Sequence, residues 1–155
     1  MIKVTDTLLE NLSRQAADSA RKRKNYNFHK EDSDKLQRML NAIEPETYIR
    51  PHRHANPDKR EIFILLKGKM AVVEFDDEGT ITDTLVAGHE MGNYCAEVTP
   101  GGWHTVISLE HGTVYYEIKD GPYDASNDKI FAEWSPEEGS EKAIPYLQSL
   151  NENIT

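Results

Sequence analysis

The sequence is poor in cysteine and in long apolar runs. Its 155 residues include one cysteine, Cys95, so no internal disulfide can form. We expect Cys95 to be buried and inert, and a reducing, cytoplasmic location fits this cysteine usage. The longest apolar runs, such as Ile62–Leu66, are far shorter than the roughly 20 residues that a membrane-spanning helix needs. Residues 1–24 carry charges throughout and do not have the pattern of a secretory signal.

Positive charge is also scarce. Lys and Arg total 18 against 27 Asp and Glu, which leaves a formal net charge of −9 at pH 7. A surface of this charge repels phosphate backbones, so we expect no nucleic-acid partner. With 37% apolar residues the chain is nevertheless foldable, and its length fits one domain.

The ends of the chain are expected to be helical. Thr7 and Glu10 have capping-box spacing, and a stripe of Leu and Ala follows them. This pattern predicts a helix that begins at about residue 5, and the polar residues 25–34 are expected to form a loop. The basic run 21–24 falls after the stripe and is expected to be a solvated helix end; phosphate docking is its alternative. Residues 135–138 resemble a helix start, and a short helix is expected over about 145–152.

The middle of the chain, residues 36–120, is rich in short β-forming runs separated by Pro and Gly. Eight strands are expected, with a hairpin tip at residues 77–79: Gln37–Ile43, Thr47–Pro51, Ile62–Leu66, Met70–Phe75, Ile81–Val86, Tyr94–Val98, His104–Leu109 and Thr113–Lys119. Short strands without interleaved helices predict an antiparallel sandwich or barrel. We therefore expect a single domain: an N-terminal helix and loop (about 5–35), a β core (36–120) and a C-terminal extension (121–155).

Three histidines and one glutamate form the most informative pattern. His52 and His54 are two residues apart, so they share a face of an extended segment. Glu61 opens the next apolar run, and a Pro-Gly turn directly precedes His104. Three imidazoles and a carboxylate are a ligand set for one divalent first-row transition metal, such as Fe, Mn, Zn, Ni or Co. For Glu61 the alternative is a surface carboxylate.

These motifs resemble those of the two-motif cupins. In the first cupin motif, five residues separate a Gly from His-x-His, about three or four residues separate the second His from a Glu, and six residues separate that Glu from a final Gly. Here Glu46 stands in the place of the first Gly, and six residues separate His54 from Glu61. In the second motif, Pro-x-Gly-x-x-His, Gly101 and His104 match while Pro100 is displaced by one. The resemblance implies a double-stranded β-helix, or jelly-roll barrel, that binds a metal.

More narrowly, the chain resembles the WbuC family of cupin-fold metalloproteins. The matching segments are NYNFH (25–29), QRMLNAIEPETYIRPHRH (37–54), GGWHT (101–105) and YEIKDGPYDASNDKIFAEWSPEEG (116–139). Members of that family are often encoded beside genes for surface polysaccharide, O-antigen type, biosynthesis. The resemblance therefore implies a sugar-like ligand, and cupins commonly form homodimers through their sheet edges.

Several other residues are candidates for substrate binding, each with a structural alternative. Arg50 lies two residues before His52 and so would share its face on an extended segment. It either clamps an anion above the metal or forms a structural ion pair. Tyr48 is expected in the cavity wall, and Trp103 either packs or stacks on a ring-shaped ligand. The remaining candidates either cover the barrel mouth or serve as ordinary loop and ion-pair residues: Asn25, Asn27, His29 and Arg38. Glu117 and Lys119 share a face and either reach the cavity or form a cross-strand pair.

Three classes of function remain open from the sequence. The first is a metal-dependent enzyme acting on a sugar or nucleotide sugar, by isomerisation, epimerisation or, with iron, oxygen-dependent oxidation. The second is a non-catalytic binding module, favoured by the lack of a second carboxylate clearly fixed near the histidines. The third is a scaffold with a vestigial site.

Overall fold

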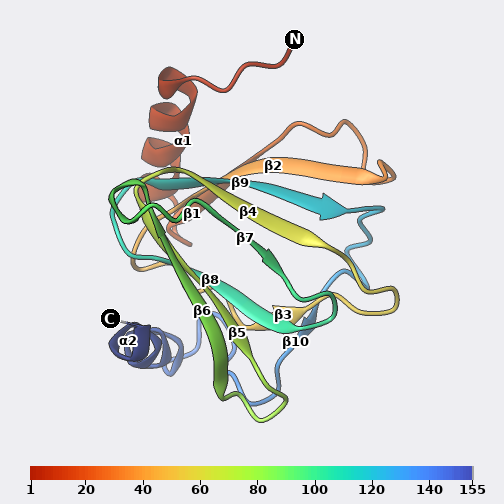
Figure 1. Cartoon of the computed structure of the whole chain (residues 1–155), viewed down its shortest axis with the longest axis vertical. Coiled ribbons are helices and arrows are strands. Elements are labelled where there is room, and N and C mark those ends of the chain that lie inside the picture. The colour runs from red at the N-terminus through yellow and green to blue at the C-terminus, as the bar shows by residue number, and fades with distance from the viewer. Residues whose placement is uncertain (155) are drawn as a thin grey trace.

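Two antiparallel five-stranded sheets face each other in the computed structural model, which describes residues 1–154 (Figure 1). The first sheet has the order β1 (Arg23–Asn27), β2 (Leu36–Ile43), β9 (Thr113–Asp120), β4 (Glu61–Lys67) and β7 (Cys95–Val98). The second has the order β10 (Ile130–Phe131), β3 (His52–Arg53), β8 (Trp103–Ser108), β5 (Lys69–Phe75) and β6 (Ile81–Gly88). The helices are α1 (Asp6–Asp18) and α2 (Ala143–Ile154), and η1 (His89–Met91) is a single 3₁₀ turn.

Alternation along the strands produces three apolar layers. Residues of both sheets fill the layer between them: Ile43, Phe63, Leu65, Met70, Val72, Ala87, Val98, Val106 and Tyr115. The opposite face of the first sheet packs against α1, through Leu12 and Leu40 among others. The opposite face of the second sheet packs against α2, where Leu147 meets Val73 and Ile107. Each fully buried Leu, Ile or Val stabilises the fold by about 1.5–3 kcal/mol, so both helices are integral to the sandwich.

The predicted mainly β fold with a helix at each end is confirmed. Seven of the eight expected strands are present within a residue or two of their expected bounds, and the expected tip at 77–79 joins β5 to β6. There the Asp76 carboxylate accepts hydrogen bonds from the backbone N–H groups of Glu78 (3.0 Å) and Thr80 (2.7 Å). Among the described residues, no helix is long and apolar enough to cross a membrane.

The N-terminal expectations need correction. The side chain of Thr5, rather than Thr7, caps α1 by accepting a hydrogen bond from the N–H of Leu8. The helix ends at Asp18, so the basic run is not its last turn. Residues 23–27 form strand β1 instead of a loop, because they pair with the edge of β2, with Asn25 opposite Asn41.

Three further expectations are wrong. Residues 47–51 form no strand, since Thr47 closes a turn with Glu44 (2.9 Å between N and O). Residues 135–138 begin no helix, because the Ser135 hydroxyl donates to the Ala132 carbonyl instead of capping one. Pro145 instead lies in the first turn of α2. Cys95 is exposed, because it points outward from the edge strand β7.

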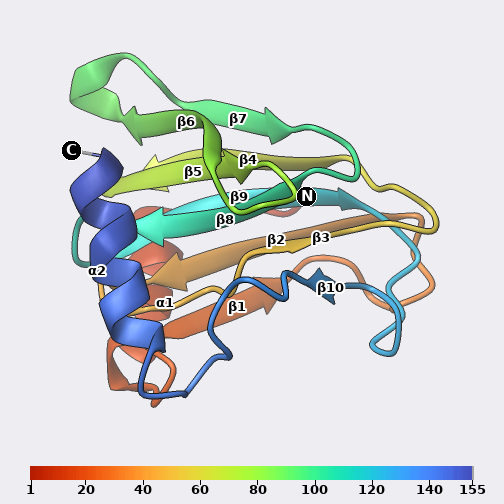
Figure 2. The same ribbon diagram turned by 90° about the horizontal axis from the view of Figure 1, so that it is seen from below.

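The two sides of the sandwich differ. On the side of β6 and β7, a bridge joins Gly88, at the end of β6, to Asn93, which lies two residues before β7. On the other side the sheets end in β1 and β10, and these two described strands do not pair with each other (Figure 2). The short segment between β6 and β7 thus connects the sheets along one side, and no comparable segment among the described residues connects β1 with β10 along the other, open side.

Candidate metal centre

His52 and His104 lie directly opposite each other on neighbouring strands. They are register partners in the antiparallel pair of β3 and β8, and their ring centroids are 4.6 Å apart. Because side chains alternate along β8, His104 and Val106 face the interior, and Trp103 faces the α2 side. The Pro-Gly turn thus sets which residue of β8 points inward.

His54 and Glu61 complete the cluster from two different sheets. His54 follows β3 by one residue, and the chain then turns through residues 55–58 before β4 begins at Glu61. Glu61 pairs with Lys119 on one side and Val98 on the other, so strand pairing fixes its position. The long spacing after His54 is absorbed by the loop, and the Glu61 side chain reaches the histidines from the opposite sheet.

The four side chains converge and are shielded from water. One ligand atom from each of His52, His54, Glu61 and His104 lies within 4.8 Å of the other three. All four residues are 2–4% exposed. Oε2 of Glu61 lies 3.0 Å from Nε2 of His54 and 2.9 Å from Nε2 of His104. This is a compact donor set of three nitrogens and one carboxylate.

The protons of the imidazoles point away from this centre. Nδ1 of each ring contacts a backbone carbonyl oxygen: that of Arg50 for His52 (2.9 Å), that of Asp128 for His54 and that of Gly102 for His104 (3.0 Å). A carbonyl only accepts, so Nδ1 carries the proton and the Nε2 lone pair faces inward.

The buried acceptor atoms therefore lack partners. Among the described residues, Nε2 of His54, Nε2 of His104 and Oε2 of Glu61 have no hydrogen-bonding partner. Lone pairs packed together without protons repel, and a cation removes that repulsion. Burial, reinforced by the positive charge of Lys129, also lowers the pKa of His52 well below 6.5, which keeps it in the neutral, ligating form. The residues present fit a divalent metal.

A network of buried ions supports His54 from behind. The Asp128 carboxylate accepts from Nζ of Lys59 (2.7 Å) and from Nζ of Lys119 (2.8 Å), and Lys59 also donates to the Pro122 carbonyl (2.7 Å). These bonds fix residues 122–128, whose Asp128 carbonyl orients the His54 ring. The C-terminal extension thus contributes to the centre although it supplies none of the four donor atoms.

A cavity of about 480 Å³ lies over the centre. His52, Glu61 and His104 line it, with an apolar wall of Ile43, Ile49, Phe63 and Val106. Its polar lining comes from Asn41, Tyr115 and Glu117 on β2 and β9. A cavity of this size holds a small organic molecule, and the polar groups can orient it.

Glu117 is the second carboxylate that the sequence did not clearly place. Its Oε2 accepts a hydrogen bond from Nδ2 of Asn41 at 2.8 Å. Burial, together with the charge of Glu61, raises the pKa of Glu117 to about 8. Burial and the same two carboxylates raise the pKa of Tyr115 well above 10, so both groups can donate hydrogen bonds at neutral pH. The sequence pattern that indicates this position is the alternation along the strand, which puts residues 115, 117 and 119 on one face.

Tyr48 and Arg50 do not line the cavity. Residues 47–51 form no strand, so Tyr48 and Arg50 do not share a strand face with His52. The Tyr48 hydroxyl donates to the Pro136 carbonyl at 2.9 Å, and its ring packs among residues under α2. Arg50 donates to the Ala132 carbonyl (2.9 Å) and to the Ser135 hydroxyl (3.2 Å). Both residues attach the C-terminal extension to the sandwich.

The other candidate substrate-binding residues divide between the cavity and the surrounding surface. Asn25 lines the cavity and donates to the Asn27 side chain at 2.9 Å, whereas Asn27 does not line it. His29 contacts the backbone of Arg38, and Arg38 shares the α1-side parity of Leu40 on β2. Trp103 donates to Asp77 at 2.9 Å and stacks with Arg53, outside the cavity.

Comparison with known proteins identifies the family. The sequence model of DUF6016, described as a domain of unknown function, matches residues 4–87, more than half of the chain. The chain belongs to the DUF6016 family. The DUF6016 match includes His52, His54 and Glu61 and ends before His104. No curated protein matches the chain in sequence.

Solved structures similar to this DUF6016 chain have the cupin fold. A cupin 2 domain-containing protein from Halorhodospira halophila has a TM-score of 0.53 and 14% identity, covering 86% of this chain and 83% of its own. The capsular polysaccharide assembling protein CapF from Staphylococcus aureus has a TM-score of 0.55 and 19% identity, covering 70% of this chain and 29% of CapF. KdgF from Halomonas has a TM-score of 0.51 and 10% identity, covering 67% and 83%. The predicted cupin fold is confirmed, and the narrower WbuC resemblance stays a prediction.

Proposed function

We propose that this protein is a metal-dependent cupin enzyme that acts on a small polar substrate. His52, His54, Glu61 and His104 would hold one divalent first-row transition metal, with Fe, Mn, Zn, Ni and Co as the candidates. The observation that carries the proposal is the convergence of unprotonated, buried donor atoms at the base of a cavity. When bound, the metal supplies Lewis-acid polarisation of a substrate carbonyl or hydroxyl oxygen.

The residues around the centre have separable roles in this proposal. The apolar wall formed by Ile43, Phe63 and Val106 excludes water from the substrate. The Asn41 amide orients the Glu117 carboxyl, which donates to a substrate oxygen and can exchange a proton with it. Proton movement between neighbouring positions of a sugar is the core of isomerisation and epimerisation. We therefore favour that class over oxygen-dependent oxidation by iron, and over a non-catalytic binding module.

A sugar or nucleotide sugar is the substrate class we favour. The WbuC-type segments resemble proteins encoded near surface polysaccharide genes, and CapF is named as a capsular polysaccharide assembling protein. Hydroxyl-rich molecules also suit the amide, phenol and carboxyl groups that line the cavity. A homodimeric state, a cytoplasmic location and a lack of nucleic-acid binding are part of the same proposal.

Elemental analysis of protein purified without a chelating tag tests the metal site. We expect about one metal ion per chain in the parent and a strong loss in His104→Ala. His111→Ala is the matched control, because His111 is an exposed histidine that contacts Glu44 outside the cavity. Circular dichroism verifies that each variant is folded. A parent without metal, or equal losses in the two variants, contradicts the proposal.

Glu117→Gln tests whether the site is catalytic. The amide retains the shape of the side chain but cannot exchange a proton, so we expect normal metal content and loss of turnover on a sugar and nucleotide-sugar panel. Parent protein loaded with metal that converts no member of the panel, with or without air, would favour the binding-module alternative.

A further inference from the structure

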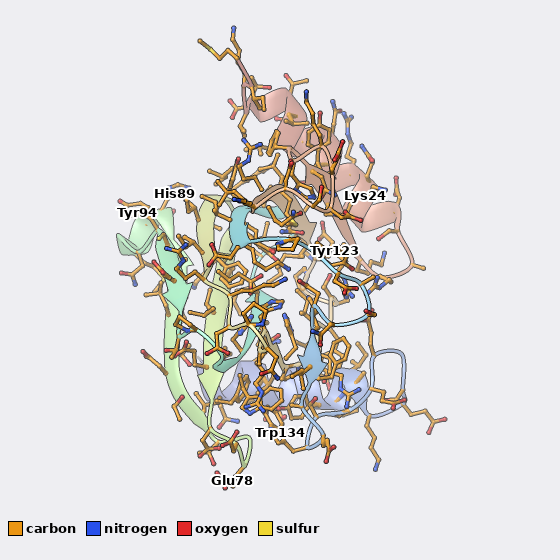
Figure 3. All side chains as sticks on the ribbon, turned by 90° about the vertical axis from the view of Figure 1, so that its right-hand side faces the viewer. Lys24, Glu78, His89, Tyr94, Tyr123 and Trp134 are labelled. Carbon is orange, nitrogen blue, oxygen red and sulfur yellow. The ribbon has the colours of Figure 1, made fainter. Side chains whose placement is uncertain are left out.

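The open side of the sandwich carries positive charge at the cavity mouth. Four cationic side chains line the cavity: Arg21, Arg23, Lys24 and Lys129. They come from both edges of the opening, since Arg23 and Lys24 are the first residues of β1, Arg21 lies just before it, and Lys129 directly precedes β10. Figure 3 shows Lys24 on the side of the molecule opposite His89 and Tyr94, which lie in the segment between β6 and β7. In a chain of net charge −9, this gathering of cations at one opening is a local reversal of sign.

The acidic groups of the cavity lie at its base. Among the described residues that line the cavity, the carboxylates are Glu61 and Glu117, which are 2% and 9% exposed. Lys24 and Lys129, in contrast, are exposed. The cavity therefore has a polarity: a deep end with metal-binding and hydrogen-bonding groups, and an outer rim of ammonium and guanidinium groups.

Half of the rim charge has no partner within the protein. Among residues 1–154, neither Lys24 nor Lys129 forms an ion pair or a side-chain hydrogen bond. Arg21 and Arg23 instead share one carboxylate, Glu138, at 2.7 and 2.8 Å. Arg23 is held in place by a further bond to the Tyr48 carbonyl at 2.9 Å. Glu138 thus occupies two cations that could otherwise contact a ligand.

We propose that the cavity binds a small organic anion, with its phosphate or carboxylate group at the rim of Arg21, Arg23, Lys24 and Lys129 and its hydroxyl-bearing end at the metal centre. The inference rests on the function proposed above and adds the charge of the substrate. Guanidinium and ammonium groups bind phosphate and carboxylate oxygens through charge-assisted hydrogen bonds, and an electropositive mouth raises the rate of capture. Glu138 then acts as a competing internal anion.

Calorimetric titration with three matched probes tests the inference: glucose, glucose 6-phosphate and glucuronate. They share a pyranose ring and differ in the group at carbon 6. We expect at least one of the two anions to bind about tenfold or more tightly than glucose, with an affinity that falls as salt increases. The phosphate and carboxylate arms show which anion the rim prefers. Equal affinity for all three probes, or no binding of either anion, overturns the inference.

Variants locate the effect at the rim. The double variant Lys24→Gln/Lys129→Gln should lose most of the preference for anions, and Lys67→Gln/Lys142→Gln, which removes two exposed lysines away from the cavity, should keep it. Glu138→Gln should strengthen anion binding several-fold, because it releases Arg21 and Arg23. An equal loss in the two double variants, or weaker binding in Glu138→Gln, contradicts the assignment.

Metal content measured on the same samples separates this inference from the proposed function. Metal-loaded protein that does not distinguish the probes refutes the anion inference and leaves the metal site intact. Metal-free parent protein that prefers the anions refutes the metal-dependent function and leaves the rim assignment standing.

Discussion

At the scale of single residues, the metal centre depends on where protons are placed. Three backbone carbonyls hold the Nδ1 protons of His52, His54 and His104, and so leave three Nε2 lone pairs directed at one point. The Glu61 carboxylate adds a fourth acceptor there. A centre of this kind contains no hydrogen-bond donor of its own, and any substitution that introduces one should oppose metal binding.

Glu61→Gln makes that substitution with little change in shape. Its amide nitrogen can donate to Nε2 of His54 or His104, which Oε2 of Glu61 approaches to 3.0 and 2.9 Å. We expect a marked loss of metal together with a metal-free form at least as thermally stable as the chelated parent, because a buried repulsion becomes a hydrogen bond. Elemental analysis and thermal melting with and without a chelator provide the two readouts. Undiminished metal content in Glu61→Gln would show that Glu61 is not a ligand.

At the scale of elements, the β4–β5 turn shows how closely two strands approach. Gly68 has φ +80°, and a Cβ there would lie 2.5 Å from Oγ1 and 2.8 Å from Cα of Thr113. Gly92 has a similar φ of +72° but open space around it. A comparison of substitutions at Gly68 and Gly92 therefore distinguishes the cost of backbone strain from the cost of steric overlap.

Gly68→Ala should therefore destabilise the protein more than Gly92→Ala. We expect Gly68→Ala to lose at least about 2 kcal/mol of unfolding free energy, since strain and overlap add, and Gly92→Ala to lose only the strain component. Urea denaturation of both variants measures the difference. Equal losses would mean that Thr113 moves aside without cost.

The C-terminal extension is a second element whose role depends on a few contacts. Asp128 forms ion pairs with two buried lysines, Lys59 and Lys119, and its own carbonyl orients His54. Asp128→Asn should cost about 3–5 kcal/mol, because it leaves buried positive charge without a counter-ion, and it should also weaken metal retention.

Asp120→Asn is the matched control for Asp128→Asn. Asp120 pairs with the exposed Arg60, where solvent screens the interaction, so its loss should change stability little and metal content not at all. Chemical denaturation and elemental analysis are the measurements. If Asp128→Asn behaves like Asp120→Asn, residues 122–128 do not support the centre.

At the scale of the whole molecule, the metal centre joins the two sheets. Glu61 belongs to the first sheet, whereas His52 and His104 belong to the second. A bound ion would stabilise the folded state by mass action, and its ligands would join the two halves of the sandwich.

Removal of the metal should accordingly lower the melting temperature. We expect a chelator to reduce the Tm of the parent by roughly 5–10 °C, as tight binding contributes a few kcal/mol and a domain of this size shifts by a few degrees per kcal/mol. His104→Ala should show little further change on chelation. A parent that contains metal and melts at the same temperature after chelation would show that the centre does not couple the sheets.

Much of this architecture could be predicted from local patterns. Alternating runs revealed seven strands, and the spacing of His52, His54 and His104 indicated the metal centre, because period-two alternation is a property of neighbouring residues. Tertiary context decided the rest. Residues 23–27 form a strand because they pair with the free edge of β2. Arg50 does not face the cavity as expected, because residues 47–51 are not a strand that continues from His52. The cationic mouth joins residues more than 100 positions apart, which no local pattern could show.

The register of β8 limits which changes in chain length the fold can accept. His104 and Trp103 are adjacent and face opposite sides of their sheet, so inserting one residue into the 99–102 turn would exchange an imidazole for an indole beside His52. The 55–60 loop has no such constraint, because Glu61 takes its place from β9 and β7 rather than from a count that starts at His54. Among related chains, we expect the loop to vary freely in length and the turn to keep its length.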